Sequence, residues 1–399
     1  MKKIQNYNNF LHQNNVKQPS LLKEFNSFFL GSVIFLSLMP FFVWNYGLNF
    51  FILTNSFFLW LVRKHLKRNI KFSTWFSLGL FILIFSFSIF EGNISQVKFY
   101  KFLTHIFIFI FLFLNDEFVL KVYEKFKLIL FYSLLVSFLI YLIVVLDLIN
   151  IPFYYVKPLN SLKESDYYVY FFLTSINTIN FFNFRFFGIF DEPGVVGTIT
   201  GLVLYIDHFN FKDKKNILFL LSGIFSFSLF FYFLLLAYYV LRVKNIRSIL
   251  FFLFIIMLYN YTTNNELLND LIWDRLQLVE GRLSGDNRVS ETLLDQFKVF
   301  LTSSDLLFGK GGEFVNQYSE GSSSYILVLM SKGLIFSIFI CYVYFYLLIK
   351  RKVGITSYID FGIIFLGTMY QRPYYLETYF FFIFFVSSII FSNRSKIVT

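Results

Sequence analysis

The chain has one cysteine and four histidines in 399 residues. A single thiol, Cys341, cannot form an intramolecular disulfide or a cysteine-based metal cluster. The histidines do not have the HxxxH spacing of a zinc site, and none lies in 150–193 or 262–324, the two long segments between apolar runs. We therefore expect no metal, no cofactor and no Ser-His-Asp mechanism. The four histidines are His12, His65, His105 and His208.

Charge is also scarce, since only 15% of the residues are charged while 57% are hydrophobic. Soluble domains rarely have this balance, whereas membrane proteins that cross the bilayer several times commonly do. The formal net charge of +11 could indicate nucleic acid. In so apolar a chain, we attribute it to Lys and Arg in cytoplasmic loops, and we expect no nucleic-acid partner.

Apolar runs long enough to cross a membrane recur along the chain. A helix of about 20 apolar residues spans a hydrocarbon core of about 30 Å. The run 216–241 has basic residues on both flanks, which predicts two passes joined by a hairpin near 226–228. The twelve candidate spans are 28–44, 46–62, 72–90, 99–114, 128–149, 194–210, 216–228, 229–241, 248–261, 325–349, 356–371 and 375–391.

The distribution of charge predicts that both termini are cytoplasmic. The segments assigned to the cytoplasm hold 23 of the 35 Lys and Arg, whereas 262–322 has ten acidic and five basic residues and belongs outside. The predicted fold is an all-α polytopic membrane protein with a single integral-membrane domain over 1–399, about 12 transmembrane helices, and large outer loops at 150–193 and 262–324. The cytoplasmic segments are 1–27, 63–71, 115–127, 211–215, 242–247, 350–355 and the C-terminus.

The first outer loop ends in FRFFGIFDEPGVVG at 184–197. Proline is favoured at the first position of a helix, and an acidic residue before it can cap free backbone N–H groups. This predicts Glu192 as the N-cap of the sixth span. The motif reads either as a tightly packed helix start with Arg185 as a surface charge, or as a site for an anionic head group at a helix N-terminus. The aromatic residues upstream favour a segment in the membrane interface.

Arginines gather in the second outer loop. Arg275, Arg282 and Arg288 fall within fourteen residues, and Arg372 lies in the short outer turn YQRPYYLE at 370–377. Single arginines in such places are usually solvated or anchor the interface. Together with Arg185, they favour a phosphate-bearing partner, because arginine forms bidentate bonds to phosphate and is always charged.

The rest of the second loop predicts local structure. Asp286 is a good N-cap for a helix that places Val289, Leu293, Phe297 and Phe300 or Leu301 on one face, against the membrane or other spans. LLFGKGGEF (306–314) lacks the spacing of a nucleotide-binding P-loop. Ser322–Ser324 are candidates to cap the following span.

Three stretches in order resemble the O-antigen polymerase (Wzy) family and the related O-antigen ligases. They are FRFFGIFDEPGVVG, then GRLSGDNR followed by LLFGKG, then SSSYILVLMSKGLIF. The first is similar to the family's Arg-x-x-Gly-x-Phe-x-Glu-Pro element, the second to a loop arginine before a Gly-x-Gly stretch, and the third to the family's entry into a late span. The resemblance covers about 184–345 by motif, and the first five spans match by topology only.

The resemblance implies a GT-C-like integral-membrane glycosyltransferase in a bacterial inner (plasma) membrane. Such enzymes transfer a glycan from undecaprenyl pyrophosphate to a sugar hydroxyl of the next repeat unit, and build O-antigen, as in lipopolysaccharide, or capsule. A polysaccharide chain-length regulator is a common partner. Arg185 and Glu192 match the first motif and Arg288 the loop arginine. We add Arg282 and Arg372 from position and charge.

The assigned roles follow from the chemistry of the transfer. Catalytic residues are Glu192 and Asp191, as first and second candidates for the base, and Arg288. Pyrophosphate-binding residues are Arg185, Arg282, Arg288 and Arg372.

Other functions remain as alternatives. Ligases typically carry a histidine where this chain has Ser322–Ser324, which lowers that reading. A lipid-linked oligosaccharide flippase would carry charges inside its spans, and a secondary transporter would show two similar halves. A purely structural membrane protein would leave the arginine pattern without an explanation.

Overall fold

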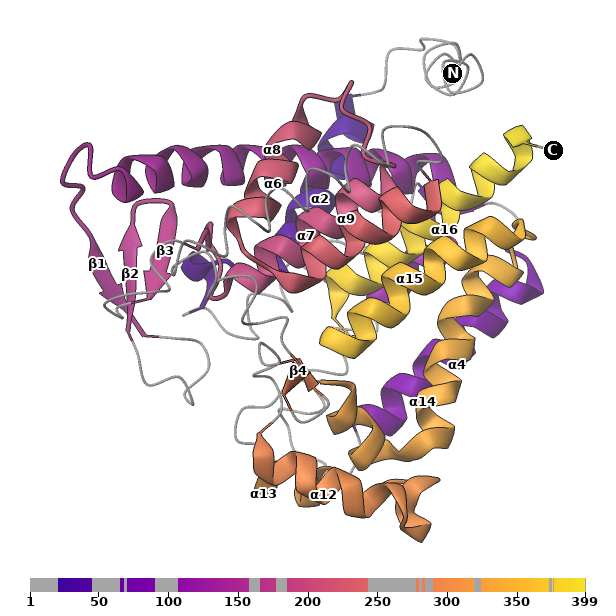
Figure 1. The fold of residues 1–399 in the computed structure, drawn as a ribbon. Coiled ribbons are helices and arrows are strands. Elements are labelled where there is room, and N and C mark those ends of the chain that lie inside the picture. The colour runs from indigo at the N-terminus through magenta and orange to yellow at the C-terminus, as the bar shows by residue number, and fades with distance from the viewer. Residues whose placement is uncertain are drawn as a thin grey trace.

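The fold is known from a computed structural model, in which the described chain is mostly helical (Figure 1). The described residues are 21–44, 65–67, 70–89, 107–157, 166–176, 185–242, 278–279, 282–283, 290–318, 324–372, 375 and 377–398. The described helices are α2 (Leu21–Leu36), α4 (Phe72–Ile89), α6 (Asp116–Val145), α7 (Pro193–Ile206), α8 (Lys215–Phe225), α9 (Leu229–Arg242), α12 (Glu291–Leu301), α13 (Gly312–Tyr318), α14 (Tyr325–Ile349), α15 (Ile355–Gln371) and α16 (Thr378–Val398). The 3-10 turns are η1 (Phe41–Val43), η3 (Phe107–Phe113) and η7 (Ser304–Leu306).

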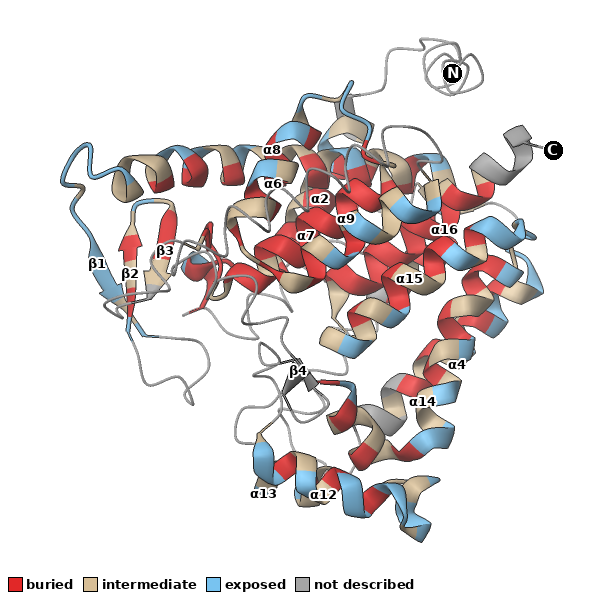
Figure 2. Ribbon diagram, viewed as in Figure 1, coloured by how far each residue is buried: buried red, intermediate tan, exposed pale blue. Residues whose placement is uncertain are grey.

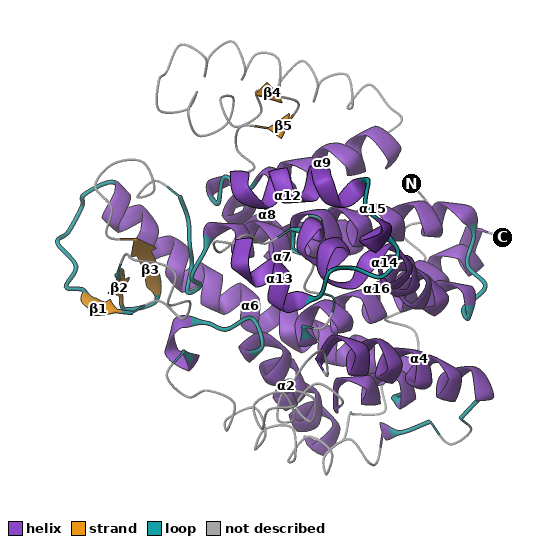
Figure 3. Ribbon diagram, turned by 90° about the horizontal axis from the view of Figure 1, so that it is seen from below, coloured by secondary structure: helices purple, strands orange, loops and turns teal. Residues whose placement is uncertain are grey.

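Short strands make the all-α prediction incomplete. The segment 150–193, predicted to be the first outer loop, holds an antiparallel sheet of order β1-β2-β3, and 262–324, predicted to be the second, holds a two-stranded hairpin, β4-β5. The larger sheet lies at one side of the helical body, beside the end of α6 (Figures 1 and 3). The strands are β1 (Tyr154–Val156), β2 (Tyr167–Tyr170), β3 (Leu173–Ile176), β4 (Leu278–Val279) and β5 (Arg282–Leu283).

Several predicted spans coincide with helices. The run 325–349 matches α14 at both ends, and 356–371 matches α15 within one residue. The run 216–241 is divided into α8 and α9, with the turn at 226–228 as predicted. Helices also cover most of 72–90, 128–149, 194–210 and 375–391. The predicted spans 46–62 and 248–261 lie outside the described residues.

Three secondary-structure elements differ in their bounds from the predicted segments. The first described helix begins at Leu21 rather than at 28 and ends at Leu36. The run 99–114 is described only from 107, where it forms the 3-10 turn η3. The segment 115–127, predicted to be cytoplasmic, is helical from its second residue, because α6 starts at Asp116. Its charged residues lie on one face while Phe118, Val122 and Phe126 are buried on the other.

Within the described residues, α6 and α14 are long and apolar enough to cross a membrane. Only 33% of the most apolar window of each helix is buried, whereas the core helix of a soluble protein is mostly buried. Large apolar or aromatic side chains such as Tyr132, Val136 and Leu139 are exposed along α6. Length, composition and exposure together indicate a helical protein associated with a membrane.

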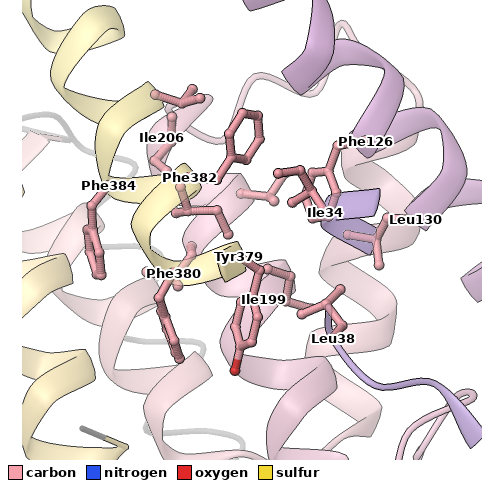
Figure 4. Close-up of a cluster of buried hydrophobic side chains, with 14 of the residues drawn as sticks. Ile34, Leu38, Phe126, Leu130, Ile199, Ile206, Tyr379, Phe380, Phe382 and Phe384 are labelled. Atoms are coloured by element: carbon pink, nitrogen blue, oxygen red, sulfur yellow. The ribbon is translucent and has the colours of Figure 1, made fainter. Parts of the chain in front are cut away.

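The core lies where α2, α6, α7 and α16 meet. Figure 4 shows Ile34 and Leu38 from the α2 region, Phe126 and Leu130 from α6, Ile199 from α7 and Phe382 from α16 in one cluster of buried side chains. Nearly all of α7 is buried, as Figure 2 shows. Helix α7 is therefore the central element of the described fold.

Two glycines four residues apart bring α7 close to the α8–α9 hairpin. A Cβ added at Gly197 would lie 2.2 Å from the Cβ of Ser228, and one at Gly201 would lie 3.0 Å from a methyl group of Leu234. Small residues at this spacing allow close approach of helices in membranes. The start of α7 and the turn at 226–228 therefore form one rigid unit.

Ion pairs join the segments that were predicted to be cytoplasmic. Asp116 binds Arg351 at 2.6 Å and Lys67 at 3.1 Å, and Lys125 binds Glu24 at 2.7 Å. Burial, followed by the like charges of Lys67 and Arg351, lowers the pKa of Lys350 to about 8. These segments therefore gather at one end of the helical body, with positive charge crowded there as in the cytoplasmic loops of membrane proteins.

A buried lysine at this end of the fold gives a test of the packing. Lys127 is 5% exposed and its ammonium lies 2.9 Å from Asp207. Replacing Lys127 with methionine leaves the Asp207 carboxylate buried beside Glu124 without its partner, which costs about 3–5 kcal/mol of unfolding free energy. Thermal unfolding of the detergent-solubilised protein measures the loss.

The control for this substitution is Lys298→Met. Lys298 pairs with Asp295 on the surface of α12 and is 66% exposed, so the change should leave the unfolding temperature almost unaltered. Adding Asp207→Leu to Lys127→Met should recover part of the loss. An unchanged unfolding temperature for Lys127→Met would contradict the buried pair.

Candidate functional site

The described part of the motif, 185–197, follows a largely buried path to the N-terminus of α7. Phe186, Phe187 and Phe190 are fully buried. The ring of Phe186 packs edge-on against Phe138 and Tyr141 of α6, with centroids 5.4 and 5.3 Å apart. These aromatic residues are core residues, and they fix the position of the charged residues that follow.

The inner face of the β-sheet holds the turn before α7. Gly188 has φ +61°, a conformation that favours glycine, and its carbonyl accepts a hydrogen bond from the Thr174 amide at 2.8 Å. The hydroxyl of Thr174 donates to the Phe190 carbonyl, and that of Tyr167 donates to the Asp191 carbonyl at 2.7 Å. Strands β2 and β3 therefore set the direction in which the chain enters α7.

Glu192 is the N-cap of α7 and Pro193 is its first residue, as predicted. The backbone of Glu192 is extended, with φ −146° and ψ 139°, but its side chain does not cap the helix. Instead, the carboxylate forms an ion pair with the guanidinium of Arg372. The N-cap position of Glu192 was thus predicted correctly, but its side chain pairs with Arg372 instead of capping the helix.

Arg372 lies just beyond the end of α15, where its amide still bonds the Thr368 carbonyl. Its side chain is 4% exposed, whereas that of Glu192 is 38% exposed. The preceding residue, Gln371, accepts a hydrogen bond from Thr198 in the first turns of α7 at 3.4 Å. This second contact was not predictable from the sequence, because a glutamine at a helix end has no distinctive spacing.

The arrangement is a partly exposed carboxylate at the N-terminus of α7, paired with a buried guanidinium at the end of α15. An ionised carboxylate accepts hydrogen bonds only, and it can take up a proton. The positive end of α7 and the guanidinium both favour negative charge nearby. The partly exposed carboxylate can therefore accept a hydrogen bond from a hydroxyl group of a ligand.

Arg185, in the same motif, contacts the turn between α8 and α9. Its guanidinium donates to the carbonyls of Ser226 at 3.2 Å and Phe227 at 3.4 Å, which form the turn between α8 and α9. Arg185 therefore fastens that turn to the motif. Its predicted contact with pyrophosphate stays a prediction.

The second outer loop packs through α12 onto the start of α14. The predicted apolar face is confirmed for Leu293, Phe297 and Phe300, which are buried, whereas Leu301 is exposed and Val289 lies outside the described residues. The N-cap is Ser290 rather than Asp286, since the Ser290 hydroxyl accepts from the Leu293 amide. Serine and aspartate are equally good caps, so sequence alone could not choose between them.

Aromatic contacts connect the two sides of the site. The ring of Phe297 on α12 meets Tyr325 at the start of α14, and Tyr325 stacks on Tyr370 with centroids 5.3 Å apart. Tyr370 lies two residues before Arg372. Ser324 caps α14, as expected, with its hydroxyl accepting from the Ile326 amide at 3.2 Å. Helix α12 is therefore held beside the helix end that carries Arg372.

The glycine-rich stretch 306–314 has a structural role. Helix α14 is broken at Gly333, which has φ 81° and ψ 174°. The amide of Lys310 bonds the Met330 carbonyl at 2.7 Å, and the amide of Ile335 bonds the Leu307 carbonyl at 3.2 Å. The loop thus satisfies backbone groups freed by the break, as broken membrane helices require.

The structure brings together some of the predicted site residues. Glu192 and Arg372 are in contact, and Asp191 precedes Glu192 in the chain, with its carbonyl accepting a hydrogen bond from Tyr167. Arg282 is in β5, where only its backbone is described, and Arg288 lies outside the described residues. Within the described part of the chain, no group of three or more His, Cys, Asp or Glu could hold a metal ion.

Comparison with known proteins leaves the site to be interpreted from its own chemistry. A scan of protein-family models, a search of curated proteins and a search of solved structures each found no match to this chain.

Proposed function

We propose that this protein is a membrane glycosyltransferase that polymerises undecaprenyl-pyrophosphate-linked oligosaccharide units. The observation that carries the proposal is the ion pair between Glu192 and Arg372 at the N-terminus of α7. It unites the Glu-Pro motif of one outer loop with an arginine 180 residues away in another. The motif resemblance supplies the substrate class, and the pair supplies a positioned carboxylate for the reaction.

In the proposed reaction, a hydroxyl oxygen of the next repeat unit attacks the anomeric carbon of the growing glycan. A new C–O bond forms, and the bond to the lipid pyrophosphate breaks, with the electron pair leaving on the phosphate oxygen. The hydroxyl proton passes to the Glu192 carboxylate, with Asp191 as the alternative acceptor. Arg372 positions Glu192.

Positive charge would stabilise the pyrophosphate as it leaves. The N-terminus of α7 and the loop arginines Arg282 and Arg288 are assigned to this charge, which donors placed in advance can stabilise by a few kcal/mol each. The contacts from α12 through Tyr325 to Tyr370 support this assignment, because Arg288 lies two residues before the N-cap of α12.

The proposed topology has about twelve spans in a bacterial inner membrane, with both termini cytoplasmic. Support comes from α6 and α14 and from the ion pairs that gather the basic segments at one end. The motif of the first outer loop and the Arg372 turn meet at the site, as the proposed sidedness requires.

Deletion of the gene tests the function. Loss of the surface-polysaccharide ladder on a gel, with single repeat units left on the carrier or the final anchor, is the expected result. A full ladder retained on undecaprenyl pyrophosphate would identify a ligase instead. An unchanged surface glycan would contradict both.

Arg288→Ala tests the loop arginine in the complemented deletion strain. Loss of one pyrophosphate-stabilising donor should reduce polymerisation by about 10²–10³-fold. The ladder should shrink to short chains while the amount of protein in the membrane stays normal. Arg275→Ala, in the same loop but without an assigned role, is the control. Normal chain lengths in Arg288→Ala would remove this residue from the mechanism.

A further inference from the structure

The β-sheet of the first outer loop carries a cluster of rings on its outer face. Along β2, Tyr167 and Val169 are buried, while Tyr168 and Tyr170 are only partly covered. This alternation is the two-residue period of a strand. Phe153 and Tyr155, from β1 and the residue before it, complete the cluster, which we call the aromatic face: Phe153, Tyr155, Tyr168 and Tyr170.

The rings of the aromatic face form a continuous surface. The centroid of Tyr168 lies 4.6 Å from that of Phe153 and 5.1 Å from that of Tyr155, and Tyr170 lies 5.4 Å from Phe153. Phe153 is 44% exposed and Tyr155 is 57% exposed. Contiguous exposed aromatic patches mark interaction surfaces, and tyrosine offers both a ring face and a hydroxyl group to a ligand.

The same sheet is bonded directly to the candidate site. Tyr167, on the inner face of β2, donates to the carbonyl of Asp191, the residue before Glu192. Thr174 of β3 bonds the carbonyls of Gly188 and Phe190. The aromatic face and the turn that presents the carboxylate therefore lie on opposite sides of the same strands. A long ligand held at the carboxylate can reach the aromatic face.

The sheet favours a polar ligand over a lipid chain as the partner of the aromatic face. Strand β1 is the edge of the sheet, and no described strand pairs with its outer side. Unpaired backbone groups are not tolerated in hydrocarbon. The β1–β2 connection also carries Lys163, Glu164 and Asp166. Phenol hydroxyls and ring faces on such a sheet suit a ligand with both C–H and O–H groups.

We infer that the aromatic face binds the sugar rings of the glycan substrate, next to the Glu192–Arg372 pair. This inference rests on the proposed function for the identity of the glycan. Pyranose rings place C–H groups on the tyrosine and phenylalanine faces, while their hydroxyls bond the phenol groups and the open edge of β1. The surface would hold the glycan chain while the reducing end reacts.

The test uses full-length protein in lipid nanodiscs and the lipid-free repeat-unit oligosaccharide prepared from the host polysaccharide. The double variant Phe153→Ala/Tyr155→Ala should bind this probe at least about tenfold more weakly than the wild type, because two ring contacts are lost. The matched control is Tyr132→Ala on α6, whose side chain is also 57% exposed and should not affect binding. Equal binding by the double variant and the wild type would overturn the inference.

Two further readouts separate the possible failures. A tryptophan placed by Tyr155→Trp should not be quenched by brominated lipids, and strong quenching would mean that the face lies in the membrane instead. In cells, the double variant should shift the polysaccharide ladder to shorter chains. A wild-type protein that binds the oligosaccharide but builds no polymer would refute the proposed function while leaving the sugar-binding face intact.

Discussion

Glu192→Gln is expected to abolish polymerisation, with a loss of about 10²–10⁴-fold in the rate of transfer. Glutamine keeps the size and the hydrogen-bonding capacity of the side chain, but it cannot take up the proton of the acceptor hydroxyl. Because the substitution also leaves the buried Arg372 guanidinium without its carboxylate, the amount of the variant in the membrane and its unfolding temperature are measured together with the rate. The rate is measured as polymer formed per enzyme in membrane vesicles.

The matched control is Glu117→Gln, which removes one exposed carboxylate from α6 far along the chain. It should retain the wild-type rate. A second comparison, Glu192→Asp, keeps the charge but shortens the side chain, and should restore part of the activity. Wild-type activity in Glu192→Gln would transfer the role of base to Asp191 or to another group.

Gly333→Ala should lower the free energy of unfolding by on the order of 3 kcal/mol or more. The conformation at φ 81° and ψ 174° is populated almost only by glycine and costs other residues about 1–3 kcal/mol. In addition, the new Cβ would lie 2.3 Å from the Leu307 carbonyl oxygen. The substitution should separate the 307–311 loop from α14, and it is measured by thermal unfolding in detergent.

Gly79→Ala is the control for this substitution. Gly79 is in α4, and a Cβ there meets no atom within 4 Å. Alanine should therefore keep the unfolding temperature or raise it, because it is favoured by about 0.5–1 kcal/mol inside a helix. Equal stability of the two variants would show that the break at Gly333 is not fixed by the loop.

Local features of the fold were predictable because their causes lie close in sequence. The bounds of α14 follow from an apolar run between the Ser324 cap and Lys350. The α8–α9 hairpin follows from basic residues on both flanks of a run too short for two ordinary spans. Pro193 after an acidic residue marks the start of α7.

Features that depend on distant partners were not predictable. The break in α14 needs the loop 307–311 to satisfy its backbone hydrogen bonds. A single glycine in an apolar run is not enough to predict such a break. The extension of α6 to Asp116 was not predictable, because its charged residues form ion pairs with Glu24 and Arg351, which lie far away in the chain.

The site shows the same limit. Glu192 and Arg372 were each singled out by their position at a membrane border, but their contact joins residues 180 apart in the chain. No spacing rule relates them. The support of Asp191 by Tyr167 was hidden for a similar reason, since Tyr167 belongs to a strand within a loop that was expected to lie in the interface.

The most direct test of the account is a reconstitution of purified protein in vesicles with undecaprenyl-pyrophosphate-linked repeat units. The wild type should produce lipid-linked glycans of two or more units and release one undecaprenyl pyrophosphate for each new linkage, and Glu192→Gln should produce neither. If the wild type leaves every repeat unit single, or if both proteins lengthen the glycan equally, the proposed role of the Glu192–Arg372 site is wrong.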